Sequence, residues 1–204
     1  MKLEQIVTEK NAKLNEIASN NPPEFLLGAP QLHDDDCIKV ARIIIVFNYI
    51  EMNMRRMIEI FLRANKISTK HLKYGSYVDI ANLNEKLLEG FNNLDISHKE
   101  IEHIEFRLKD IAYCRNFRNM VAHSAARRFP NEPAVVFFSK DDKESIRRTG
   151  SPVGFDHLSW MIILDDDLKM LLDRITEHEV WVAKATTKTY TDLILSDQLQ
   201  ESED

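Results

Sequence analysis

The sequence predicts a mainly α protein, a helical bundle of about five helices with a small β-hairpin insertion near residues 134–164. Its 204 residues include only 5 glycines and 6 prolines, few for a sandwich or barrel that needs many tight turns. Apolar side chains recur at three- and four-residue spacings over long stretches, which indicates helices. One stretch after Pro130 is instead rich in β-branched and aromatic residues, which favours strands. With 44% hydrophobic residues, the chain has enough apolar side chain for one sizeable core.

The first two helices are expected over residues 1–19 and 36–64. Asn20-Asn21-Pro22-Pro23 should end the first, because proline lacks the N–H and clashes with the preceding turn, and residues 21–33 should form a loop. Asp34-Asp35-Asp36 should open the second, since carboxylates complement the free N–H groups there. Apolar residues cover more than one stripe of this helix, so we expect one side to face the core and the other a partner.

A third helix is expected over residues 78–91, ended by Gly90 and Asn92-Asn93. Ser97-His98-Lys99-Glu100 fits a capping box and should open a fourth helix that runs to about residue 125. Arg127-Arg128-Phe129-Pro130 should end it.

The rest of the chain predicts a strand pair and a final helix. Residues 134–138 and 160–164 form the expected strands, and Asp165-Asp166-Asp167 should cap the last helix. We therefore expect a single domain over 1–195, with a core at about 36–126 and an elaboration over 130–195. Residues 196–204 contain four acids and no base, and we expect a frayed acidic tail.

Composition argues against several classes of protein. Two cysteines imply no disulfide framework and favour a reducing compartment, so we expect a cytoplasmic protein. The first residues are acidic too early and apolar too rarely for a signal peptide. The longest apolar run, residues 43–47, is far shorter than the roughly 20 residues that span a bilayer. A net charge of −6 also argues against a basic surface for duplex DNA, although it leaves room for a local basic site.

One segment reverses the acidic character of the chain. The 18 residues from Ile111 to Arg128 contain four arginines, one histidine and no acid. On a helix, Arg115, Asn119 and His123 fall on one line at four-residue spacing, and Arg118 lies beside them. Imidazole can exchange a proton near neutral pH, and the arginine fork matches phosphate oxygens. This group suits metal-free phosphate-ester chemistry, such as attack of an RNA 2′-hydroxyl on its own phosphodiester.

The segment resembles the signature of the HEPN superfamily, all-helical domains with an Arg, four to six residues and a His, often with a polar residue after the Arg. Arg118-Asn119-Met-Val-Ala-His123 has four intervening residues and Asn in the polar position. The likeness covers roughly residues 36–126. It implies a homodimer in which two motifs form one metal-independent endoribonuclease site, leaving a 2′,3′-cyclic phosphate and a 5′-hydroxyl. It also implies a toxin–antitoxin or phage-defence setting, with an antitoxin or regulatory partner.

Under this hypothesis His123 is the acid/base, Arg118 stabilises the phosphate and Asn119 orients the reacting groups. Arg115 would assist, and Arg127 and Arg128 would extend an RNA track, unless they are solvated loop charges. No HExxH, CxxC or phosphate-cradling glycine loop occurs, so we expect neither metal nor cofactor. Two alternatives remain open. Arg118 and His123 could cap or salt-bridge the end of an ordinary helix. The chain could also be a non-catalytic HEPN-like module that binds RNA, a nucleotide or a protein.

Overall fold

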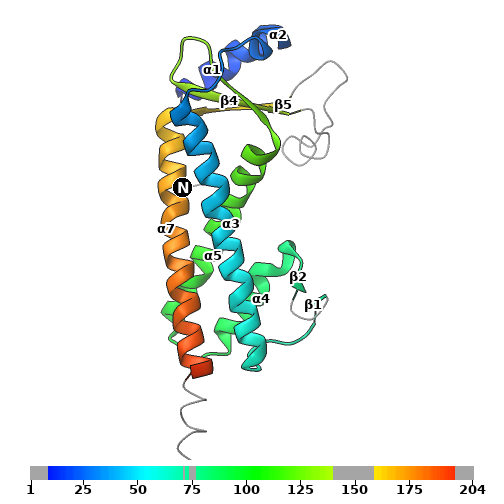
Figure 1. Ribbon diagram of the computed structural model, residues 1–204, viewed down its shortest axis with the longest axis vertical. Helices are drawn as coiled ribbons and strands as arrows, with labels where there is room; N and C mark the ends of the chain where they lie inside the picture. The colour runs from blue at the N-terminus through cyan, green and yellow to red at the C-terminus, as the bar shows by residue number, and fades with distance from the viewer. Residues whose placement is uncertain (1–8, 71, 74–76, 140–158, 196–204) are drawn as a thin grey trace, which may run out of the picture. The chain divides into compact units, whose positions relative to one another are not determined.

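The computed structural model describes residues 9–70, 72–73, 77–139 and 159–195 (Figure 1). The expected mainly helical fold with a small antiparallel sheet is confirmed. The α-helices are α1 (Glu9–Asn20), α2 (Pro23–Leu27), α3 (Asp34–Arg63), α4 (Leu83–Asn92), α5 (His98–His123) and α7 (Asp165–Tyr190). A π-helical turn, η3 (Thr191–Leu195), follows α7. No helix in the described ranges is long and apolar enough to cross a membrane.

The chain divides into two compact units. The first comprises residues 1–44 and 116–173, and the second comprises residues 45–115 and 174–204. The long helices α3, α5 and α7 therefore each contribute one part to each unit. The expected tail at 196–204 lies outside the described residues, and the expectation of a single domain over 1–195 stays a prediction.

Two segments before α5 differ from the sequence prediction. The expected loop at 21–33 contains α2, because Pro23 occupies the first helical turn, where its missing N–H costs nothing. Residue 78 lies in a strand rather than a helix: β1 (Leu72–Lys73) pairs with β2 (Tyr77–Val78), and Ile80–Asn82 forms the 3-10 turn η2 before α4. Arg55 holds this region by donating Nη1–H to the Val78 carbonyl at 2.8 Å, a contact 23 residues away in sequence.

The start of α5 matches the prediction and its end does not. The Ser97 amide donates to Glu100 Oε2 at 2.9 Å, and the Glu100 amide donates to Ser97 Oγ at 3.3 Å, which is the expected capping box. The helix stops at His123, because Ala125–Arg128 forms strand β3, which pairs with residues 135–138. Residues that helical periodicity assigned to the helix or to its end therefore pair with residues 135–138 as a strand.

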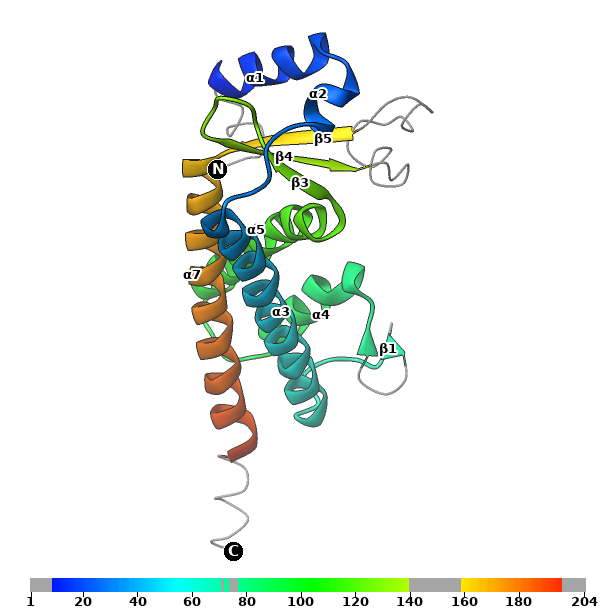
Figure 2. The same cartoon turned by 45° about the horizontal axis from the view of Figure 1, so that its top comes forward.

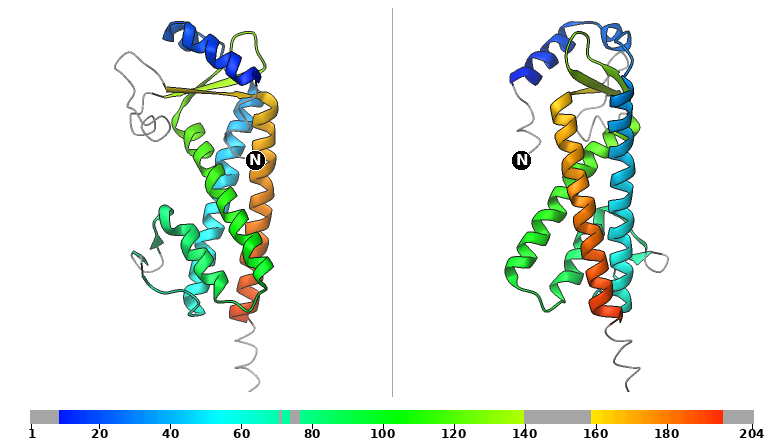
Figure 3. Two further views of the ribbon diagram at one scale, coloured as in Figure 1. Left: turned by 180° about the vertical axis from the view of Figure 1, so that it is seen from behind. Right: turned by 60° about the vertical axis from the view of Figure 1, so that its left-hand side comes forward.

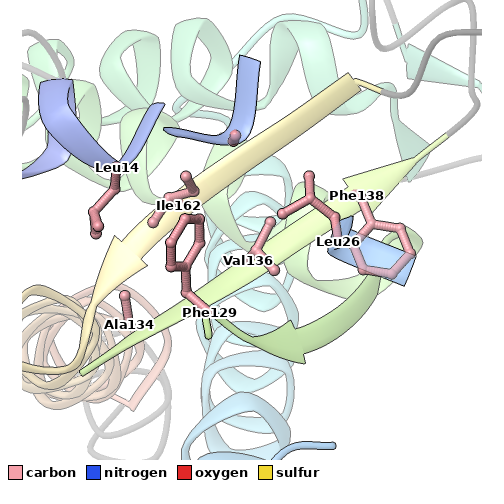
Figure 4. Packing of buried hydrophobic residues seen from close by; sticks show 8 residues of the cluster. Leu14, Leu26, Phe129, Ala134, Val136, Phe138 and Ile162 are labelled. Carbon is pink, nitrogen blue, oxygen red and sulfur yellow. The ribbon is translucent and has the colours of Figure 1, made fainter. Parts of the chain in front are cut away.

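The first unit is built around a three-stranded antiparallel sheet of order β3-β4-β5, one strand more than the predicted hairpin. Strand β4 (Ala134–Ser139) pairs with β5 (Ser159–Leu164) from Ala134↔Leu164 to Ser139↔Ser159. Figures 2 and 3 show α1 and α2 on one side of this sheet. Alternate residues of the strands face these two helices, and Figure 4 shows the resulting buried cluster of Leu14, Ala18, Leu26, Phe129, Ala134, Val136, Phe138 and Ile162.

The second unit packs the later part of α3 with α4, the first part of α5 and the later part of α7. Phe61 of α3 meets Phe91 of α4 edge to face, with ring centroids 5.2 Å apart. Asn84 of α4 donates to the Leu108 carbonyl of α5 at 2.9 Å, and Thr186 of α7 donates to the Asn53 carbonyl of α3 at 3.3 Å. These contacts close a helical core, which includes Phe47, Ile50, Met54, Ile58, Leu87, Ile111, Ile175 and Val182.

Candidate functional site

Arg118, Asn119 and His123, here called the Arg–Asn–His segment, lie in the last two turns of α5. These turns belong to the first unit. Phe117, Met120 and Val121 are buried and fix this part of the helix against the interior of the protein. The intervening positions fall toward the surface: Arg118 and Asn119 are half-buried, and His123 is exposed. Helical periodicity thus separates an anchoring side from a polar side, and all three motif residues lie on the polar side.

Arg118 and Asn119 form a direct pair. Arg118 Nη1–H donates to Asn119 Oδ1 at 3.0 Å. The side-chain carbonyl oxygen of Asn119 thus lies on the guanidinium, and the expected role of Asn119 in orienting the reacting groups stays a prediction. This bond restricts the arginine fork and directs Asn119 Nδ2, a donor, away from the guanidinium. A half-buried guanidinium held in this way needs less ordering when it binds an anion.

His123 is the last residue of α5, and its exposed imidazole makes no hydrogen bond or ion pair to the described residues. An exposed imidazole can exchange protons with a ligand and with solvent. The alternative in which His123 caps or salt-bridges its helix therefore gains no support from the described contacts. The same side chain is accessible for the acid/base role that the sequence analysis assigned to it.

Arg115 lies one turn before the motif on α5, in the second unit. Its Nη1 is 3.5 Å from the Ile80 carbonyl oxygen, and its Cζ lies 6.0 Å from the centre of the Phe47 ring. Both contacts tie this half-buried guanidinium to the second unit. They give Arg115 a structural role, and its expected assistance to substrate binding stays a prediction.

The two arginines of β3 differ in their surroundings. Arg128 donates to both oxygens of Asp165, at 2.7 and 3.0 Å, and lies 3.3 Å from Asp36 Oδ1. The side chain is only 11% exposed, and the hydrogen bonds that it donates to Asp165 raise its pKa above the ordinary value. Arg128 thus joins β3 to the first turns of α3 and α7. Because two carboxylates occupy its guanidinium, Arg128 is not part of the proposed RNA track. Strand alternation places half-buried Arg127 on the opposite face, where its expected RNA contact stays a prediction.

A buried polar cluster in the second unit was missed by the sequence analysis. Asp110 of α5 accepts hydrogen bonds from Arg174 Nε at 2.7 Å, from Arg174 Nη2 and from His178 Nε2 at 2.7 Å. Arg174 and His178 are four residues apart on α7, a spacing that places them on one face and was the available signal. The sequence alone offered no reason to pair that face with Asp110, which lies more than sixty residues earlier.

The protonation states of this cluster follow from burial and charge. Burial acts to raise the pKa of Asp110, yet hydrogen bonds from Arg174 and His178 leave it below its ordinary value. Burial lowers the pKa of His178, and the charges of Arg107 and Arg174 lower it further against the effect of Asp110. His178 Nδ1 is buried without a hydrogen-bond partner, which also disfavours a proton there. The cluster therefore holds a carboxylate, a guanidinium and a neutral imidazole.

The neighbouring thiol and phenol are unreactive in this environment. Burial raises the pKa of Cys114 to about 12 and that of Tyr113 to about 12. Cys114 is fully buried on α5, so it behaves as a packed apolar side chain. Neither residue adds a nucleophile to the Arg–Asn–His segment.

Within the described ranges, no three His, Cys, Asp or Glu residues are grouped so that they could hold a metal ion. The groups available for chemistry in the last turns of α5 are therefore a paired guanidinium, an amide and an imidazole. These groups can bind a phosphodiester and move one proton. Comparisons with protein-family models, with curated proteins and with solved structures find no match to this chain.

Proposed function

We propose that the protein is a metal-independent endoribonuclease of HEPN type that acts as a homodimer. One observation carries the proposal: the hydrogen-bonded Arg118–Asn119 pair and the exposed His123 lie on the polar side of the last turns of α5, in a segment without acids. Such a segment attracts the phosphate backbone, because its four arginines are not accompanied by any acid in the sequence. We propose a cytoplasmic toxin or phage-defence role, with an antitoxin or regulatory partner.

The reaction needs one base and one acid. His123 removes the proton of the RNA 2′-hydroxyl, whose oxygen then bonds to the adjacent phosphorus. Arg118 stabilises the negative charge that builds on the non-bridging oxygens. The bond from phosphorus to the 5′-oxygen breaks, and an acid gives that oxygen a proton. The products are a 2′,3′-cyclic phosphate and a 5′-hydroxyl, and no metal or cofactor takes part.

The need for a general acid that protonates the 5′-oxygen supports a homodimer. His123 is the sole histidine between residues 111 and 128, so one copy of the segment supplies one imidazole. His123 of the partner subunit would supply the second, protonated imidazole. A monomer with a single motif would bind phosphate without a matched acid–base pair, which is the property of the alternative, a non-catalytic module that binds RNA, a nucleotide or a protein.

An apolar stripe on α3 offers a surface for this second copy. Ile45, Tyr49 and Met52 are each more than half exposed, at 54%, 53% and 53%. Their spacing of four and three residues places them on one helix face, and it is the spacing of a helix–helix seam. Exposed Ile38 precedes Ile45 by seven residues on the same helix. The sequence predicts a partner-facing side for α3, and the exposure of this stripe supports that part of the proposal.

The test is RNA cleavage by purified protein in EDTA, with product ends mapped. We expect the wild type to leave cyclic phosphates, and we expect His123→Ala to reduce the rate at least 100-fold, because general acid–base catalysis contributes about 10²–10⁴. Arg118→Lys should also lose most activity, since lysine cannot reproduce the fork. His98→Ala is the matched control, an exposed histidine at the other end of α5.

A substrate with a 2′-deoxy residue at the cleaved position tests this mechanism, because it lacks the attacking hydroxyl. His123→Ala purified in the same way excludes cleavage by a contaminating ribonuclease. Equal cleavage by wild type and His123→Ala would refute the proposal. RNA binding that survives His123→Ala, is lost in Arg118→Ala and is accompanied by no cleavage would favour the non-catalytic module.

A further inference from the structure

The exposed apolar stripe of α3 continues toward the end of that helix as a charged stripe on the same face. Six exposed side chains follow one another at alternating spacings of four and three residues, namely Ile45, Tyr49, Met52, Arg56, Glu59 and Arg63. Alternating spacings of four and three place side chains along the line at which two helices pack. These six residues, here called the α3 seam, all lie in the second unit.

The α3 seam has an apolar half and a charged half. Its first three side chains are apolar, and they suit any helix that carries an apolar stripe. In the charged half, neither Arg56 nor Arg63 forms an ion pair or side-chain hydrogen bond within the described ranges. Glu59 lies between them in sequence and interacts with other groups. Both guanidiniums are therefore available to a carboxylate on a partner.

These two guanidiniums decide what kind of helix can pack on the whole seam. A helix laid along the seam removes water from Arg56 and Arg63. A guanidinium that loses its water is stabilised only if it gains a carboxylate in return, because an unpaired charge is costly to desolvate. A helix that covers the whole seam must therefore place acidic side chains opposite both arginines.

A second copy of the chain does not meet this requirement. Each α3 seam contributes two arginines and one glutamate, so two seams packed together would leave at least two guanidiniums without an acid. The apolar half still suits the second copy proposed above. The complete seam is better matched by a different helix, one that is apolar in one half and acidic in the other.

We infer that the α3 seam binds an acidic amphipathic helix of another protein. Apolar side chains of that helix pack on the first three residues of the seam, and its carboxylates bind Arg56 and Arg63. The seam spans 18 residues, or about 27 Å at about 1.5 Å per residue, so a partner helix of about 20 residues covers it.

The bound helix covers the apolar stripe that is proposed to hold the second copy, so it excludes the homodimer. This consequence rests on the proposed function, in which the nuclease site needs two copies. The docking of the helix does not rest on it.

The test is a fluorescence anisotropy titration of the full chain with a labelled synthetic peptide of about 20 residues, held helical by lactam bridges on its outer face. The peptide has leucine at the seam positions of one half and glutamate at those of the other. Both orders of the two halves are made, because helices pack in parallel or antiparallel pairs. We expect saturable binding in one order, weakened by salt. A control peptide with lysine for each seam glutamate should not bind.

Charge reversal on the protein assigns the contacts. Arg56→Glu together with Arg63→Glu should weaken the glutamate peptide about tenfold or more and should allow the lysine peptide to bind. Both positions are exposed, and circular dichroism checks that the helices persist. Lys184→Glu is the matched control, an exposed cation of α7 in the same unit and outside the seam, and it should leave both affinities unchanged.

Three outcomes of the titrations would overturn the inference: no saturable binding in either order, equal affinity in the charge-reversed variant, or equal binding of the lysine peptide. Sedimentation velocity with and without the peptide separates the docking site from the proposed homodimer. Loss of a wild-type dimer on peptide binding would support the exclusion of the second copy, and a dimer that persists at saturating peptide would refute it. A monomeric wild type that binds the peptide would refute the homodimer and leave the docking site in place.

Discussion

Gly90 shows how a single side chain can be excluded by a partner in another helix. The sequence analysis used Gly90 to end a helix, but α4 continues through it to Asn92. A Cβ at this position would overlap the ring of Phe61, which itself packs edge to face on Phe91. Glycine is present here because the aromatic ring of α3 occupies the space of a side chain.

We predict that Gly90→Ala destabilises the protein despite the better helix propensity of alanine. Propensity favours alanine by about 0.5–1 kcal/mol, and overpacking of a filled core costs about 1–3 kcal/mol. Urea unfolding should therefore show a lower free energy of unfolding for the variant. In a Phe61→Leu background the same change should cost less, because the overlap is relieved. A stabilising effect in the native background would contradict this account.

Arg128 and Arg127 are adjacent in sequence, yet their substitution should have different consequences. Arg128→Ala leaves the nearly fully buried Asp36 without its cation, and loss of one partner of a buried pair costs about 3–5 kcal/mol. Arg127→Ala, on the opposite strand face, should cost less than about 1 kcal/mol. Thermal and urea unfolding of the two variants measure this difference. Equal effects would show that the ion pairs of Arg128 are not what stabilises the first unit.

At the scale of elements, the Asp110 cluster joins α5 to α7 within the second unit. Asp110 forms a bidentate ion pair with Arg174 and a hydrogen bond with His178. Tyr113 adds a ring whose centroid lies 5.4 Å from Arg174 Cζ. Because one carboxylate serves both α7 residues, Asp110→Asn should lower the free energy of unfolding by about 3–5 kcal/mol.

We also predict a pH dependence of stability that originates at His178. The pKa of His178 is lower in the folded protein than the value near 6.5 of an unfolded chain, so the unfolded chain takes up the proton first. The contribution of neutral His178 to the free energy of unfolding is complete above pH 6.5 and is lost as the pH falls below that value. The charged groups around the imidazole are Asp110, Arg107 and Arg174, and the lowered pKa of Asp110 keeps its carboxylate ionised in this window.

The urea midpoint measured from pH 7.5 down to pH 5 tests this prediction. His178→Gln, which keeps a donor near Asp110 but cannot titrate, should flatten the slope in that window. His98→Gln removes an exposed histidine and should leave the slope unchanged. At more acid pH, protonation of Asp110 adds a second loss, since its lowered pKa also favours the folded state only while it is ionised. A wild-type midpoint that rises on acidification would contradict the assignment.

At the scale of the whole molecule, the proposed nuclease site depends on a homodimer. We predict that Tyr49→Asp, at the centre of the exposed α3 stripe, converts a dimer into a folded monomer that has lost RNA cleavage. A charge at the centre of an apolar seam is costly to desolvate, while an exposed position tolerates it within the monomer. Sedimentation velocity measures the mass, and circular dichroism checks that the helices persist.

Phe106→Asp is the matched control for the dimer. Phe106 is a highly exposed aromatic residue on α5, outside the α3 stripe. This variant should keep both the mass and the cleavage rate of the wild type. A monomeric wild type that cleaves RNA would refute both the dimeric site and the role of the partner's His123 as the acid.

Local rules predicted much of the fold, and they worked where the interacting groups are close in sequence. The capping box of Ser97 and Glu100 and the acidic first turns of α3 and α7 involve groups within four residues of each other. The Arg118–Asn119 pair involves adjacent residues, and helical spacing predicts Asn119 on the same line as His123. The strand pair was predicted because β-branched and aromatic residues in those strands are unambiguous.

Sequence by itself thus determined the long helices, the β4–β5 pair and the acid-free Arg–Asn–His segment, because each depends on periodicity or composition. Tertiary structure alone decided that Ala125–Arg128 leaves the helix for a third strand and that Arg128 binds Asp36 and Asp165. It also decided that His178 meets Asp110 and that the first turns of α5 form a groove with α7. These features depend on contacts between residues 7 to 92 positions apart, and no local pattern specifies which distant residue is the partner.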